Sequence, residues 1–186
     1  GLFTVGAFFS RFVSGRIADH AGRRPVMLFG TWITTIAGFG YIGVGWIHGS
    51  DFMPWQGMPL AIWFFLLLRL FHGMSTGFRP TGTTAFLTDI TPINRRGEAL
   101  GYLGVAGNAG MAGGPALGSW LTVEYGYDAM FIWSSILGVL ALIMTIRLPE
   151  SLPHARPVLL KDFNVFKGPV LDWSSWPASL ALLPVA

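Results

Sequence analysis

Three long stretches without any charged residue constrain the fold of this chain more than any other feature. Asp, Glu, Lys and Arg are absent from Pro25–Ile47, Ala99–Val123 and Ala129–Ile146. A helix needs about 17–25 largely apolar residues to cross the hydrocarbon layer of a membrane. Only 11% of the 186 residues are charged, whereas about a quarter are charged in an ordinary soluble domain. The chain is therefore predicted to be an integral membrane protein.

Polar and turn-forming segments indicate two further spans. We expect one over about Gly1–Ala18 and another from Leu60 to the low eighties, or as far as Asp89. All spans are predicted to be helices, because an open sheet leaves backbone groups unpaired in lipid. The expected organisation is membrane helices over 1–148, a polar connector over 149–172 and the start of another span over 173–186. Both ends lie within apolar runs, so we interpret the chain as an internal fragment of a longer protein.

Lys and Arg are unevenly divided between the two sides of this arrangement. The loops His48–Pro59 and Thr122–Asp128 contain neither residue. The opposite side holds Arg16, Arg23, Arg24, Arg95, Arg96, Arg147, Arg156, Lys161 and Lys167. Because basic loops remain in the cytoplasm, the polar turn Gly15–Arg24 is predicted to face the cytoplasm.

The turn Gly15–Arg24 contains an acid in an unusual place. Asp19 lies near the C-terminal end of the first span, where the helix dipole disfavours a negative charge. Arg23 follows four residues later and can pair with it, and the N-terminus of another helix could supply amide donors. Gly15 would let such a helix approach closely. A solvated turn that fixes two antiparallel helices explains the same residues, so both interpretations stay open.

Arg69 lies well inside the third span, and Gly73 and Gly77 follow at four-residue intervals. An arginine at this depth is expected to face the bundle interior or a water-filled cavity, and it marks a functional site. A structural hydrogen-bonding role is the alternative. Arg11 and Arg79 lie closer to the cytoplasmic end, where their side chains can reach the headgroups or line a substrate cavity.

The fourth span is rich in glycine. Gly110, Gly114 and Gly118 recur at four-residue intervals and share one helix face, on which a neighbouring backbone could pack tightly. Pro115 removes one backbone hydrogen bond and can kink the helix there. Helix packing and a moving hinge both explain this pattern, and the two are compatible.

Residues for catalysis or metal binding are not grouped in the sequence. There is no cysteine, no His-Glu-x-x-His motif and no phosphate-binding glycine loop. The four histidines lack the spacing of metal ligands, and we interpret His72 as a helix-packing residue rather than a proton carrier. The dispersed basic residues do not form a nucleic-acid surface. We therefore expect no enzyme activity, metal, cofactor or nucleic-acid partner.

Together these segments resemble the major facilitator superfamily. Gly15-x3-Asp19-x2-Gly22-Arg23-Arg24 is similar to its cytosolic loop between helices two and three, with His20 in place of the usual arginine. The Arg69-x3-Gly73-x3-Gly77 segment is similar to its fourth-helix motif. The fifth-helix motif of its antiporters resembles the positions Gly101, Gly110, Gly114, Pro115 and Gly118, with Ser119 where a second glycine is usual.

The resemblance implies a twelve-helix carrier of two six-helix halves that alternates access around a central cavity. This all-α chain would supply helix two to the start of helix seven, which is most of the N-terminal half. Asp19 and Arg23 would latch onto helix eleven in the outward-facing state, and Arg69 would take part in proton coupling. The implied partners are a small-molecule substrate, protons, the lipid bilayer and the C-terminal half of the same protein.

The function that we expect is proton-coupled efflux of a small organic compound across a bacterial inner membrane. The fifth-helix motif indicates the direction, and Arg69 indicates the coupling. A proton symporter that imports a sugar or an organic acid remains open, as does a non-transporting membrane sensor. If Arg79 and Arg11 face the cavity, they would favour an anionic cargo.

Overall fold

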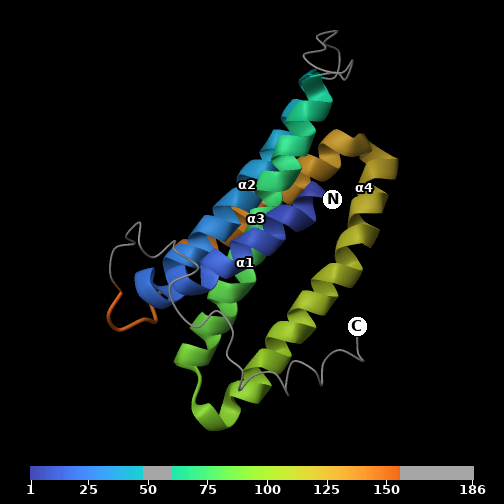
Figure 1. Cartoon of the computed structure of the whole chain (residues 1–186). Helices are drawn as coiled ribbons and strands as arrows, with labels where there is room; N and C mark the ends of the chain where they lie inside the picture. Colours follow the sequence, from blue (N-terminus) through green and yellow to red (C-terminus); the bar gives the residue numbers. More distant parts are fainter. Residues whose placement is uncertain (48–59, 156–186) are drawn as a thin grey trace, which may run out of the picture.

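The computed structural model describes residues 1–47 and 60–155, and the regular structure within them is helical (Figure 1). The helices are α1 (Leu2–Ala21), α2 (Arg23–Ile47), α3 (Leu60–Ile90), the short 3-10 helix η1 (Ile93–Arg95) and α4 (Arg96–Arg147). Three helical segments, in α2, in α3 and across η1 and α4, are long and apolar enough to cross a membrane. The predicted all-helical membrane fold is therefore confirmed.

Some of the predicted segments cannot be compared with the structure. The loop His48–Pro59 and the span predicted over 173–186 lie outside the described residues. Of the connector predicted over 149–172, the described part is 149–155.

The polar turn between the first two helices is much shorter than predicted. α1 continues through Asp19 to Ala21 and α2 begins at Arg23, so Gly22 alone separates the two helices. Gly22 has a φ of +111°, a backbone conformation that glycine adopts without a steric penalty. A single residue of this kind reverses the chain direction. The predicted polar turn is therefore too long, because α1 extends past its predicted end at Ala18 to Ala21 and α2 already begins at Arg23.

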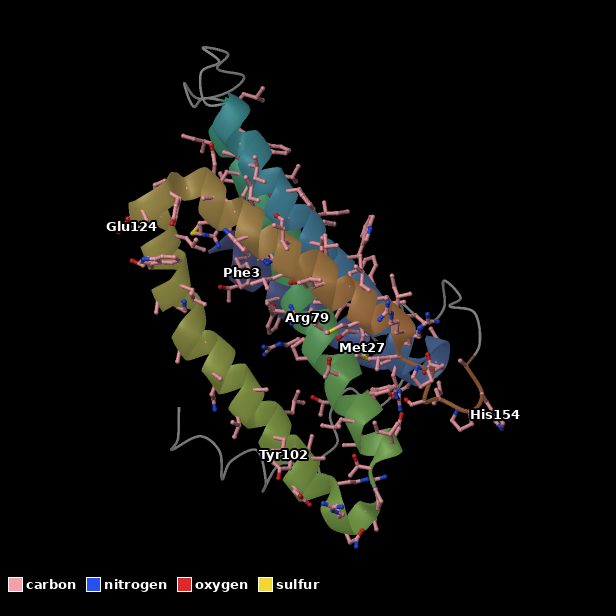
Figure 2. All side chains as sticks on the ribbon, turned by 180° about the vertical axis from the view of Figure 1, so that it is seen from behind. Phe3, Met27, Arg79, Tyr102, Glu124 and His154 are labelled. Atoms are coloured by element: carbon pink, nitrogen blue, oxygen red, sulfur yellow. The ribbon has the colours of Figure 1, made fainter. Side chains whose placement is uncertain are left out.

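α4 is assigned as one helix, but it bends sharply at Gly126, where φ is +84° and ψ is 172°. At about 1.5 Å per residue, its 52 residues exceed what one membrane crossing needs. The two limbs diverge from the bend (Figure 1), and Glu124 lies beside it (Figure 2). We call 96–125 the first limb and 127–147 the second limb. They correspond to the fourth and fifth predicted spans, and Gly126 rather than Pro115 is the residue of α4 with non-helical dihedral angles.

α3 is the central helix of the bundle. It packs against α1 and α2 along their lengths, and the second limb of α4 packs against α2. The first limb stands apart from the other helices except near its start, as both views show (Figures 1 and 2). The buried apolar residues form two small clusters, one around Ala18, Val26 and Phe78, and one around Ala37, Tyr41 and Leu68.

Glycines bring α1 and α3 into direct backbone contact. A Cβ atom added to Gly73 would overlap the carbonyl group of Phe3, and one added to Gly6 would overlap the carbonyl group of Leu70. Gly77 lies in the same way against Ser10. The fully buried Ser14 donates a hydrogen bond to the Gly77 carbonyl at 3.0 Å. The two helices therefore meet through backbone and small side chains, the packing mode that is typical of membrane helices.

Large apolar side chains cover the outside of the helices. Phe9 on α1, Trp32 and Phe39 on α2, and Leu67 on α3 are between 48% and 65% exposed. In water such a surface would be a strong association site, whereas a lipid environment solvates it. The surface of the bundle is thus suited to a membrane.

Candidate functional site

Charged residues from three helices meet at one end of the bundle. Arg23, the first residue of α2, pairs with Asp19 of α1 at 2.7 Å and with Asp89 of α3 at 3.0 Å. The Arg23 side chain is 13% exposed, against 67% for Asp19 and 29% for Asp89. Water screens an exposed ion pair more strongly than a partly buried one, so the bond to Asp89 contributes more. Arg23 thereby links the ends of α1 and α3.

Glu150, in the segment after α4, binds the start of α2. Its carboxylate accepts hydrogen bonds from the backbone amides of Arg23 at 2.8 Å and of Arg24 at 3.1 Å. The first amides of a helix have no partner within the helix, and the helix dipole favours a negative charge there. The neighbouring Ser151 donates a hydrogen bond to Asp89 at 2.9 Å. We call Asp19, Arg23, Asp89, Glu150 and Ser151 the Arg23 cluster.

Gly22 is required at the centre of this cluster for two reasons. Its φ of +111° lies in a region that is costly for residues with a Cβ atom. A Cβ atom there would also overlap the carboxylate of Glu150. Glycine at this position therefore leaves the space in which the Glu150 carboxylate binds the first amides of α2.

Arg24 extends the network to the end of α4. Its guanidinium group donates a hydrogen bond to the Ile146 carbonyl at 2.6 Å. This carbonyl belongs to the last turn of α4, where backbone acceptors lack partners within the helix. Arg23 and Arg24, in the first turn of α2, thus contact the ends of α1, α3 and α4.

Part of this cluster could be predicted from the sequence. The predicted pair of Asp19 and Arg23 is present. Gly15 was expected to face a closely packed helix, but a Cβ atom there would meet no described atom within 4 Å. Asp89 was taken only as a helix boundary, although it is an acid at a helix C-terminus and the dipole argument applied to Asp19 identifies it equally. No sequence signal distinguished Glu150 from other loop acids.

Arg69 lies against aromatic rings. Its guanidinium carbon is 5.2 Å from the ring centre of Phe65 and 5.8 Å from that of Tyr41, within the range of a cation–π interaction. Tyr41 is 9% exposed and stacks on Phe131 of the second limb, with ring centres 5.4 Å apart. Arg69 itself is exposed. The enclosure that was predicted around Arg69 is therefore not formed by the described residues.

Most of the remaining predicted site residues are exposed, whereas Gly118 is half-buried. Arg11 on α1 and Arg79 on α3, which is labelled in Figure 2, both have exposed side chains. On the first limb of α4, a Cβ atom added to Gly101, Gly110 or Gly114 would meet no described atom within 4 Å. At Gly118 it would come within 3.7 Å of the Met130 sulfur. In the described part of the chain no group of three or more His, Asp or Glu side chains could hold a metal ion.

A sequence profile described as the Major Facilitator Superfamily matches residues 1–185. The chain belongs to the major facilitator superfamily. Among curated proteins it is similar to an uncharacterized MFS-type transporter of Mycobacterium tuberculosis, at 27% identity over 88% of this chain and 28% of the relative. It is also similar to Multidrug resistance protein 1 of Bacillus subtilis, at 28% identity over 78% of this chain and 34% of that protein.

Another relative in this superfamily is the Quinolone resistance protein NorA of Staphylococcus aureus, at 28% identity over 84% of this chain and 39% of NorA. The chain thus spans between 28% and 39% of the length of these three relatives. The resemblance predicted from the motifs is confirmed, and the described helices form part of a major facilitator fold. Members of this family are integral membrane transporters that act on small molecules.

Proposed function

We propose that this chain is the N-terminal part of a proton-driven antiporter that exports a small organic compound across a bacterial inner membrane. Relatives named for multidrug resistance and quinolone resistance support export. The glycines of α4 with Pro115, which resemble the fifth-helix motif of antiporters in the superfamily, support the same direction. A quinolone is therefore a suitable first cargo to test.

The Arg23 cluster is the observation that carries this proposal. It connects the ends of the helices through hydrogen bonds and ion pairs rather than through apolar packing. Exposed ion pairs are individually weak, so their partners can exchange during a conformational change. Asp19, at 67% exposure, has room for a second partner, and amides at the N-terminus of another helix suit a carboxylate. We propose that Asp19 and Arg23 latch onto such a helix in the C-terminal half.

The distribution of charge supports a cytoplasmic position for this latch. Arg23 contacts Asp89 at the end of α3, and Arg24 contacts Ile146 near the end of α4. Arg147 is the last residue of α4, so all three arginines lie at the same end of the bundle. The opposite end, at the bend of α4, contributes Glu124, which is labelled in Figure 2, and Asp128, which follows the bend in the sequence. Basic ends are retained in the cytoplasm.

The first limb of α4 is proposed to pack against a part of the carrier that lies outside this chain. A helix with this many glycines is weak by itself, and close packing against another helix offsets the weakness. The described residues provide no such neighbour for Gly101, Gly110 or Gly114. The limb would then be part of the surface along which the two halves move.

Arg69, Arg11 and Arg79 are proposed to act by charge. A guanidinium group stays protonated at any physiological pH, so Arg69 would not carry the proton itself but would influence a neighbouring group that does. Arg11 and Arg79 would attract an anionic group of the cargo, such as the carboxylate of a quinolone. Both arginines are exposed in the described chain.

The experiment that tests the proposal measures proton movement directly. The complete protein is placed in liposomes that contain a pH-sensitive dye, and the fluorescent quinolone norfloxacin is added outside. Antiport predicts that the interior pH rises as norfloxacin enters, whereas symport predicts that it falls. Arg69→Ala should abolish the change and His154→Gln should not, while protein-free liposomes give the background. An interior pH that stays constant during norfloxacin entry would contradict the proposal.

A further inference from the structure

The proposed proton coupling requires a group that gains and loses a proton within the membrane. We infer that His72 of α3 is this group, in place of the helix-packing role that the sequence alone indicated for it. The inference rests on the proposed antiport. Arg69 is excluded because it stays protonated. The acids of the described helices lie at helix ends or at the bend of α4: Asp19, Asp89, Glu98, Glu124 and Asp128. Of the side chains inside the described spans, only His72 has an ordinary pKa near neutrality.

His72 is held in place by one polar contact and one aromatic contact. Its Nδ1 atom is 3.1 Å from the hydroxyl oxygen of Tyr41 on α2. The ring of Phe3 on α1 meets the imidazole edge to face, with centres 5.6 Å apart. The Tyr41 ring is the one over which Arg69 lies. Residues from two neighbouring helices, α1 and α2, thus fix the orientation of the imidazole ring. Helix packing alone would require only an apolar side chain at this position.

The second nitrogen of the ring is available for a proton. No hydrogen bond from the described residues reaches Nε2 of His72, whereas Nδ1 is bonded to Tyr41. His72 and Tyr41 also line a cavity of about 940 Å³ between α2, α3 and the two limbs of α4. We assign the tautomer in which Nδ1–H donates to the Tyr41 oxygen. In this tautomer the lone pair is on Nε2, and the bond to Tyr41 persists when a proton from the cavity binds there.

The groups around His72 connect its charge to the conformation of the carrier. α3 contributes the positive charges of Arg69 and, further along, Arg79, while α2 contributes Tyr41. α1 contributes the uncharged Phe3, and α4 contributes Tyr125 on the wall of the cavity. No carboxylate of the described residues is among them. A protonated His72 therefore depends on water, because a charge without a partner is costly in a dry interior. Protonation would accompany a hydrated cavity, and proton release would accompany its closure.

The proton also acts on Arg69. A charged imidazole places a second positive charge beside Tyr41, and like charges repel more strongly in the interior of a protein than in water. Arg69 is then expected to leave the Tyr41 ring when His72 is protonated and to return when the proton departs. One proton binds at Nε2 from one side of the membrane and leaves from the same atom to the other side.

The test compares two kinds of norfloxacin movement in liposomes with the complete protein. Exchange at equal pH on both sides requires only alternating access, whereas accumulation driven by a pH gradient requires a proton carrier. His72→Gln should lose accumulation by about tenfold or more and keep exchange within about twofold. The matched control His154→Gln, which lies outside the spans, should retain both. Tyr41→Phe should keep both and shift the pH midpoint of accumulation by about half a unit.

The outcomes separate the two proposals. If the wild-type protein exchanges norfloxacin but does not accumulate it, both the antiport and the role of His72 are wrong. Normal accumulation by His72→Gln would overturn the role of His72 alone.

A second readout needs neither cargo nor a stable His72 variant. In protein labelled with ¹⁵N-histidine, Tyr41→Phe should displace the nitrogen signals of one imidazole, which assigns them to His72. These signals should change from those of a neutral imidazole to those of a protonated one as the pH is lowered. An imidazole that stays neutral at every pH at which the protein accumulates norfloxacin would overturn the inference.

Discussion

The two glycine-rich helices of this chain share a spacing but differ in their surroundings. On α3, Gly73 and Gly77 lie directly against the backbone and side chains of α1. On the first limb of α4, Gly110 and Gly114 repeat at the same interval, yet an added Cβ atom would meet no described atom within 4 Å. The spacing of glycines thus indicates which face of a membrane helix can be approached closely. It does not indicate what approaches it.

The largest difference should appear on replacing glycine by valine in each helix. Gly73→Val would place a branched side chain into the Phe3 carbonyl of α1, and overpacking of this kind costs about 3 kcal/mol. We expect a large fall in the thermal unfolding midpoint of the 186-residue chain in detergent, or no folded protein. The control Gly107→Val, on the first limb, should change the midpoint only slightly. Equal losses for the two variants would remove the contrast between the helices.

Two turn glycines offer the same contrast on a smaller scale. Gly22 has a positive φ and lies against the Glu150 carboxylate, whereas Gly126 has a positive φ and open space. Gly126→Ala should cost about 1 kcal/mol through backbone strain alone. Gly22→Ala should lower the free energy of unfolding by about 2–3 kcal/mol, because the backbone strain is added to the loss of the Glu150 cap on α2. Unfolding in urea measures both, and a larger effect at Gly126 would contradict the structure.

The Arg23 cluster predicts unequal effects for its two aspartates. Asp89 is 29% exposed and Asp19 is 67% exposed. Asp89→Asn should therefore lower stability by about 1 kcal/mol and Asp19→Asn by about 0.5 kcal/mol or less. In the complete carrier the order should reverse for transport, because Asp19 is the residue proposed to contact the other half. A transport defect confined to Asp89→Asn would place the latch elsewhere.

The smallest expected effect concerns cargo charge. Arg79 is exposed and forms no ion pair with the described residues, so Arg79→Gln should leave unfolding unchanged. Competition between paired neutral and anionic compounds should show the preference for the anion falling by about threefold to tenfold. An unchanged preference would remove Arg79 from the proposed cavity.

Much of the fold could be predicted from the sequence because membranes impose simple requirements. The uncharged stretches located α2 and both limbs of α4, and the dipole argument located the pair of Asp19 and Arg23. The length of the first turn could not be predicted, because polar residues such as Asp19 can remain helical at the end of a membrane helix. Glu150 could not be predicted because its role depends on α4 returning to the start of α2, which is a tertiary contact.

The packing of the first limb against the other half of the carrier can be tested at Gly110 in the complete protein. Alanine favours a helix over glycine by about 1 kcal/mol, so Gly110→Ala should raise stability wherever this face is unpacked, as it is among the described residues. If the first limb of α4 packs against the other half of the carrier, the added methyl group should instead lower the thermal unfolding midpoint of the complete protein, as Gly77→Ala should. A midpoint that is unchanged or higher for Gly110→Ala would show that this face of the first limb does not pack against the other half.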